Sequence, residues 1–227
     1  YQSSINSGYL SYKKETLIKL VNLKNVIGIK EGSWDFSSYI ENYEFLKGII
    51  NDDKFESSAT LWPNHFTDYH PLLITARERE LAFIATNIPR RYASFVYQRG
   101  LKALEDLSLE AKEFLPPLPV PFDVSLPGYN AMLSMGGNHS LETLPMAQAI
   151  RDATMAHFIS ANLNEEVPFV HFNGTYHSQD REGIVWYLQN SNPDLEILTI
   201  HSHMQANVFP PDTNAVGRGT YLLITNE

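Results

Sequence analysis

The chain has 227 residues and no cysteine, which excludes disulfide bonds, cysteine catalysis and cysteine-ligated zinc. Hydrophobic residues make up 43% of it, and 26 acidic against 17 basic residues give a formal net charge of -9 at pH 7. This balance predicts a globular domain and argues against nucleic acid as a partner, because the protein would repel a phosphate backbone. No stretch approaches the roughly 20 apolar residues of a membrane-spanning helix. The opening YQSSINSGYL has neither the basic start nor the apolar centre of a signal peptide.

The first 46 residues predict a helix, a strand and a second helix. Apolar residues recur at helical spacing in segment 13–22. The β-branched run NVIGIK at 25–30 predicts a buried strand. Asp35 can cap a helix that continues to Leu46.

The rest of the chain predicts alternating helices and strands. Apolar periodicity predicts helices at 69–79, from Ile88-Pro89-Arg90 onward, and at 128–138, 144–163 and 181–189. Short apolar runs predict strands at 81–86, 169–172, 195–201 and 221–225. This alternation predicts an α/β fold in which a mainly parallel sheet is flanked by helices. Because five prolines between 115 and 127 interrupt it, residues 102–142 are expected to form a small helical lobe inserted into that fold.

The segment HFNGTYH, residues 171–177, follows a predicted strand and carries the most informative candidate side chains. Ligands of α/β sheets gather at the carboxyl ends of the strands. His177 follows an Asn-Gly turn there and could be a metal ligand or a general acid or base. A loop histidine that is merely solvated explains the same pattern equally well.

Residues 86–91 (TNIPRR) end another predicted strand. Pro89 in the first turn of a helix leaves backbone N–H groups free to bind an anion, and Arg90 or Arg91 could pair with a carboxylate. The alternative interpretation is a helix start with two surface arginines.

A third candidate region is WPNHFTDYH, residues 62–70, which is dense in aromatic and imidazole groups. Tyr69 or His70 could be an axial ligand of haem iron, since both residue types serve in that position; packing at a helix start is the alternative. His201 and His203 face the same side of a strand and could clamp a metal, but nothing else in the sequence completes a ligand set. No serine-nucleophile elbow, P-loop or Rossmann glycine motif occurs.

The segments YHPLL, FIATNIPRRYAS, AQAIRDATMAHFI and FVHFNGTYHSQDREGIVWYL together resemble the ChaN-like haem-binding uptake family, in order, from about Asp53 to Glu227. The Asn-x-Pro-Arg motif of the family corresponds to Asn87, Pro89 and Arg90. Its Arg-Asp-x-Thr-Met-Ala motif corresponds to Asp152, Thr154 and Met155, and its glycine-histidine turn to Gly174 and His177.

The resemblance implies an α/β fold with a small helical lobe, and haem bound with tyrosine ligation in a homodimer. It also implies a lipoprotein of the bacterial cell envelope, in the periplasm or at the outer membrane, that takes part in iron uptake. Haem propionates would suit the arginines at 90 and 91. The pocket implied for haem is lined by Tyr69, His70, Asn87, Arg90, Asp152, Tyr176 and His177.

The sequence departs from the family at its start. The opening Gly-Glu-x-His motif is missing, because no histidine precedes His65. Residues 1–46 instead resemble a fragment of the dihydrodipicolinate synthase/N-acetylneuraminate lyase aldolases, with Lys30 as the Schiff-base lysine and Tyr1 as the proton relay. Alternatively they are a divergent first strand-helix unit of the ChaN-like domain at 47–227. Glu31 would then be the acid of that strand and a partner of His177 in binding a divalent metal.

These observations favour a non-enzymatic haem- or iron-binding protein of the envelope. One alternative is a metal-dependent hydrolase of the erythromycin-esterase/Tiki-like superfamily that uses His177 with Glu31 or Asp152. Another is a pyruvate-type aldolase that uses Lys30. A fourth is a fragment that folds poorly and has no activity.

Overall fold

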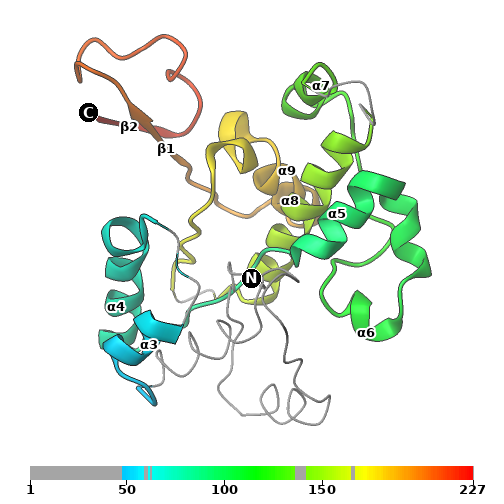
Figure 1. Cartoon of the computed structure of the whole chain (residues 1–227). Coiled ribbons are helices and arrows are strands. Elements are labelled where there is room, and N and C mark those ends of the chain that lie inside the picture. The colour runs from blue at the N-terminus through cyan, green and yellow to red at the C-terminus, as the bar shows by residue number, and fades with distance from the viewer. Residues whose placement is uncertain (1–47, 59–60, 62, 136–141, 165–166, 227) are drawn as a thin grey trace. The chain divides into compact units, whose positions relative to one another are not determined.

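The computed structural model describes residues 48–58, 61, 63–135, 142–164 and 167–226 (Figure 1). Within it the chain divides into two compact units, one ending at Arg90 and the other beginning at Arg91. The elements predicted for residues 1–46, with Glu31 and Lys30, lie outside the described residues.

The described residues of the first unit form three short helical elements: α3 (Asp52–Ser58), the π-helix η1 (His65–Tyr69) and α4 (His70–Glu78). Phe55 of α3 packs against Leu73 of α4 in a small core. Arg77 donates to Asp52 across 2.7 Å and ties the same two helices together. The helix predicted at 69–79 is confirmed as α4.

Residues 81–86 and 169–172 do not form the predicted strands. The two runs are only partly buried: Thr86 is buried and Phe169 packs against the core of the second unit, whereas Leu81, Val170 and Phe172 are exposed. A strand also requires a partner for its backbone N–H and C=O groups, which an apolar run alone does not provide. Among the described residues, neither run has such a ladder.

The second unit is built mainly from helices. They are α5 (Arg90–Arg99, which begins at the boundary), η2 (Leu101–Asp106), α6 (Leu109–Lys112), α7 (Pro127–Leu133), α8 (Thr143–Ala161), η3 (Thr175–His177), η4 (Gln179–Arg181) and α9 (Ile184–Ser191). The helix predicted at 144–163 is confirmed as α8. Residues 115–126 form the expected irregular connector, and the region predicted as a lobe carries α6 and α7.

Helices α8 and α9 form the main core of this unit. The residues that pack there are Ala153, Met155, Ala156 and Ile159 from α8, with Ile184, Tyr187 and Leu188 from α9. Helix α9 begins three residues later than the predicted segment 181–189. The reason is local: Arg181 and Gly183 have positive φ angles of 61° and 55°, which a right-handed helix does not accept.

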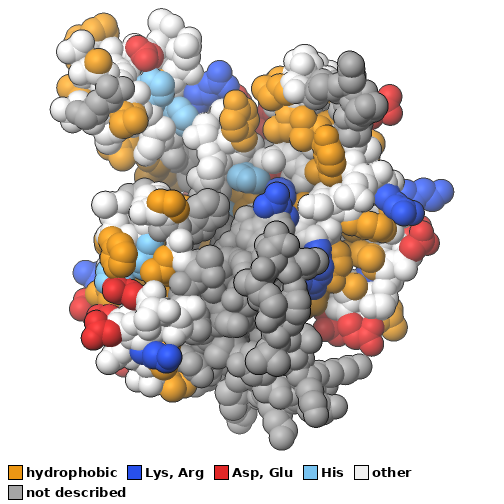
Figure 2. Space-filling view, in the orientation of Figure 1, with side chains coloured by type: hydrophobic (Ala, Val, Ile, Leu, Met, Phe, Trp, Pro, Cys, Tyr) orange, Lys and Arg blue, Asp and Glu red, His pale blue; other side chains and the backbone are white. Residues whose placement is uncertain are grey.

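The sheet of the described residues consists of two parallel strands, β1 (Ile200–Met204) and β2 (Tyr221–Thr225), with Ile200 opposite Tyr221. The strand predicted at 221–225 is confirmed as β2, whereas β1 starts near the end of the segment predicted at 195–201. Alternate side chains of both strands are exposed, and Figure 2 shows hydrophobic side chains on the surface of this part.

The described part of the chain is therefore helix-rich with a small parallel sheet, which is consistent with an α/β fold. None of its helices combines the length and the apolar character that crossing a membrane requires.

Candidate functional site

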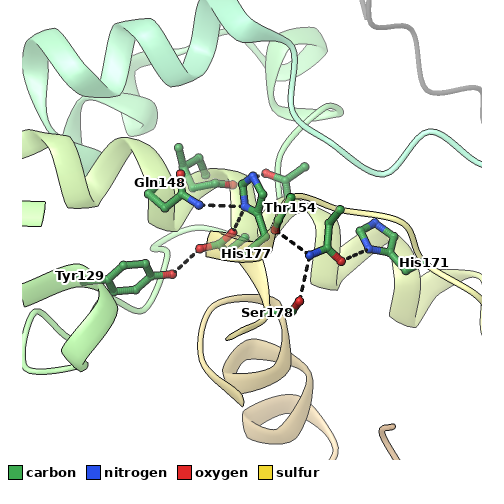
Figure 3. Close-up of polar contacts among 10 residues, drawn as sticks. Tyr129, Gln148, Thr154, His171, His177 and Ser178 are labelled. Carbon is green, nitrogen blue, oxygen red and sulfur yellow. Dashed lines mark hydrogen bonds and ion pairs between the residues drawn. The ribbon is translucent and has the colours of Figure 1, made fainter. Parts of the chain in front are cut away.

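Asp152 is the centre of a polar cluster inside the second unit, with Tyr129 and His177, both labelled in Figure 3, as its hydrogen-bond partners. It lies on α8 among the core residues and is fully buried. Its Oδ1 atom is 2.5 Å from Nδ1 of His177 in η3, and its Oδ2 atom accepts a hydrogen bond of 2.8 Å from the Tyr129 hydroxyl in α7. Two residues proposed for the pocket, 25 positions apart, are thus in direct contact.

Burial and hydrogen bonding act in opposite directions on Asp152. Burial raises the pKa of this carboxyl, while the contacts with His177 and Tyr129 lower it. Burial, followed by the negative charge of Asp152, raises the pKa of Tyr129 far above its ordinary value. Tyr129 is therefore protonated at any physiological pH and remains a hydrogen-bond donor to Asp152.

The contacts of His177 fix the direction of its ring. Because Nδ1 faces Asp152, the imidazole Nε2 atom points away from the carboxylate (Figure 3). The side-chain amide of Gln148 lies 2.9 Å from the same Nδ1 atom. Its oxygen and nitrogen exchange places by a half-turn, so this amide can also accept from the Nδ1–H group. A carboxylate behind an imidazole is the arrangement that orients metal-ligating histidines.

Gly183, directly before α9, lets the backbone approach this cluster closely. A Cβ atom here would overlap the carbonyl oxygen of His177 and lie 3.1 Å from Oδ2 of Asp152. Glycine is required on both counts, since the positive φ at this position also disfavours a side chain.

The loop that precedes His177 is held by its own polar side chains. Oδ1 of Asn173 accepts a hydrogen bond of 3.0 Å from Nδ1 of His171 in the tautomer in which that nitrogen carries the proton. Its Nδ2 group donates to the Gly174 carbonyl and to the Ser178 hydroxyl, each at 2.9 Å. The Asn173 side chain thus links the segment before η3 to Ser178, the residue that follows η3.

Apolar side chains are exposed on the same segment. Phe169 points into the core, whereas Val170, Phe172 and Tyr176 are 70%, 66% and 60% exposed. Exposed apolar residues clustered on one segment are typical of a surface that binds an apolar partner.

The remaining predicted pocket residues belong to the first unit. Tyr69 and Arg90 are exposed, and Asn87 is partly buried with an Oδ1 atom that has no hydrogen-bond partner in the described structure. His70 lies beside His65, with ring centroids 5.5 Å apart. Glu31, the predicted metal partner of His177, is outside the described residues.

Three site residues were missed by sequence reasoning: Tyr129, Gln148 and Gly183. Gln148 was detectable, because it precedes Asp152 by one helical turn and therefore faces the same side of α8. Tyr129 and Gly183 carry no local signal of their role. In the part of the chain that the structure describes, no group of three or more histidine, aspartate or glutamate side chains is placed to hold a metal ion.

His157, also on α8, makes a testable contribution to the pH dependence of stability. Burial lowers the pKa of this histidine below its ordinary value of 6.5. As pH falls through that value the unfolded chain binds the proton first, so the free energy of unfolding decreases. In His157→Gln, urea unfolding at pH 7.5 and 5.5 is expected to show a smaller decrease than in the wild type. The decrease should not vanish, because burial also lowers the pKa of His65 and His201. If the free energy of unfolding of His157→Gln decreased as much as that of the wild type, this assignment would be contradicted.

Comparison with known proteins gives one match. The family model described as haem-binding uptake, Tiki superfamily, ChaN, matches residues 34–188, which include Asp152 and His177. No curated protein and no solved structure matches the chain. The match begins within the segment 1–46, and no comparison supports the aldolase resemblance of that segment. The chain belongs to the ChaN-like haem-binding uptake family of the Tiki superfamily.

Proposed function

We propose that this protein binds haem for iron uptake at the bacterial cell envelope, with Nε2 of His177 as a ligand of the iron. The family match supports the haem-binding role. The observation that carries the choice of ligand is the 2.5 Å contact between Nδ1 of His177 and the buried Asp152, which leaves Nε2 free to face a ligand. When bound, haem would supply an iron centre to which an imidazole nitrogen can bind.

The residues around His177 fit this group. The carboxylate of Asp152 would hold the ring in one orientation. The exposed side chains of Val170, Phe172 and Tyr176 would cover part of the porphyrin, which is largely apolar. Tyr176, on the same segment as His177, would offer an oxygen ligand, since the family resemblance implies tyrosine ligation.

The finer features of the proposal extend beyond the site. Arg90, with Asn87 near it in the sequence, would pair with a haem propionate. A homodimer and lipoprotein attachment at the outer membrane or in the periplasm complete it. These features follow from the resemblance to the family.

Titration of the apo protein with haemin tests the ligand. We expect a Soret shift that His177→Ala abolishes or strongly weakens and that His157→Ala, a histidine replaced elsewhere in the same unit, leaves unchanged. Tyr69→Phe and Tyr176→Phe are run in parallel. If a tyrosine variant lost the Soret shift while His177→Ala kept it, that tyrosine would be the ligand instead of His177. If the wild type showed no shift at micromolar haemin, haem binding would be refuted.

The hydrolase alternative uses the same pair of residues. An imidazole backed by a carboxylate can act as a general base, so Asp152 and His177 could also serve hydrolysis with a bound divalent metal. Ester or peptide turnover that a chelator abolishes would favour this function over a non-enzymatic one. We favour haem binding, because the family match names it.

A further inference from the structure

The turn between His177 and α9, residues 178–183, has an unusual backbone. Asp180 and Arg181 carry side chains yet have φ angles of 57° and 61°, and Gly183 has a φ of 55°. Left-handed backbone is strained for residues with a Cβ atom, so it persists only where surrounding contacts impose it. The contacts that impose it determine how firmly the turn is held.

Arg218, in the loop that leads to β2, contacts this turn twice. Its Nη1 group donates to Oδ2 of Asp180 at 2.6 Å, and its carbonyl accepts from the backbone N–H of Asp180 at 3.0 Å. Its Nε group donates at 3.0 Å to the Asn214 carbonyl, which restrains the guanidinium. A further bond runs from Arg181 to the Ile197 carbonyl at 3.2 Å. Residues 197–218, beyond the end of the family match at 188, thus hold a turn that lies inside it.

The last two residues of the turn, Glu182 and Gly183, are in close contact with the Asp152 cluster. Gly183 leaves no room for a Cβ atom beside the His177 carbonyl. Glu182 accepts from the backbone N–H of Gly128 at 2.7 Å, in the first turn of the helix that carries Tyr129. A displacement of the turn would therefore move the backbone of His177. It would also move Tyr129, which donates to Oδ2 of Asp152.

We propose that Arg218 is a positioning residue: it fixes the turn 178–183 through Asp180 and so holds His177 in the orientation that ligates haem. The haem part of this proposal rests on the function proposed above. Among the described residues, the side-chain hydrogen bonds of Arg218 reach Asp180 and Asn214 but neither His177 nor Asp152, so Arg218 acts on these two through the turn. The C-terminal segment 189–227, which the family model does not match, would then support a site that lies inside the matched segment 34–188.

The half-exposed ion pair implies a local effect and little change in global stability. The Arg218 and Asp180 side chains are 37% and 39% exposed, and ion pairs of such exposure contribute little to the free energy of unfolding. Loss of the pair should instead increase local opening of the turn, which amide hydrogen exchange detects.

Hydrogen exchange of the apo protein and haemin titration test the proposal together. In Arg218→Ala we expect exchange of the amides of residues 177–183 to accelerate about fivefold while the urea midpoint barely changes. Haemin affinity should fall about fivefold, less than the change expected for the direct partner Asp152. Arg218→Lys, which keeps the charge, should restore part of the wild-type amide protection and part of the haemin affinity. The matched control is Arg99→Ala, which removes an exposed arginine of α5 and should change neither.

Asp180→Asn provides the second variant, because asparagine tolerates left-handed backbone. Its effects should not add to those of Arg218→Ala if the two residues act as one link. Unchanged exchange and unchanged haemin affinity in Arg218→Ala would overturn the proposal. The two readouts also separate it from the proposed function: if the wild type does not bind haemin, ligation fails, while exchange of the apo protein still decides whether Arg218 holds the turn.

Discussion

Replacing Asp152 by asparagine is expected to weaken haemin binding by about 10- to 100-fold, the range found when the partner of a metal-ligating histidine is removed. The asparagine has nearly the shape of aspartate but carries one acceptor oxygen and one donor amide. Both neighbours donate to Asp152: Tyr129 at Oδ2 and, when its Nδ1 is protonated, His177 at Oδ1. One of these donors would therefore meet an N–H group, and His177 would lose its fixed orientation.

Stability should change less than affinity in this variant. An unpaired buried donor costs about 1–3 kcal/mol. The raised pKa of Asp152 indicates that burying its charge is itself unfavourable, and asparagine avoids that cost. We therefore expect the free energy of unfolding to decrease by about 1 kcal/mol, the lower end of the range for an unpaired buried donor. Asp194→Asn, an exposed aspartate of the same unit, is the control for haemin titration and urea unfolding. Wild-type haemin affinity in Asp152→Asn would show that the carboxylate does not orient the ligand.

Replacing Gly183 by alanine is expected to have the largest effect on stability. The new Cβ atom would meet the carbonyl oxygen of His177, which is backbone and cannot rotate aside, and would approach Asp152. Overpacking of this kind costs about 1–3 kcal/mol. The strain of a side chain at a positive φ angle adds to it.

Gly217 offers a matched control for this variant. It has a positive φ angle of 85°, but a Cβ atom there would have no neighbour within 4 Å. Gly217→Ala should therefore incur the backbone strain without the overlap. In urea unfolding, Gly183→Ala should lose about 2 kcal/mol more than Gly217→Ala. Equal losses would mean that the backbone of His177 moves freely, and the close approach would then have no energetic role.

The helices were more predictable from the sequence than the strands because their hydrogen bonds are local. The pattern that places α8 and α4 needs only residues within a few positions of each other. A parallel strand needs a partner far away in the sequence, which apolar composition does not identify. The apolar runs at 81–86 and 169–172 were thus expected to pair and did not, while β2 found a partner in β1.

The site was partly predictable for a related reason. Family motifs singled out Asp152 and His177, and the structure brings them together. Tyr129 lies on α7, 23 positions before Asp152 and outside any motif, so only the folded chain connects it with Asp152. The roles of Tyr69, His70, Asn87 and Arg90 in binding haem stay predictions.

The most direct test of ligation by His177 is chemical rescue. His177→Gly removes the imidazole, and added imidazole can occupy the space that it leaves. We predict that haem co-elutes with the wild-type protein in size-exclusion chromatography, that His177→Gly loses this haem, and that imidazole in the buffer restores it. Haem retained by His177→Gly without imidazole, at the wild-type level, would contradict the account.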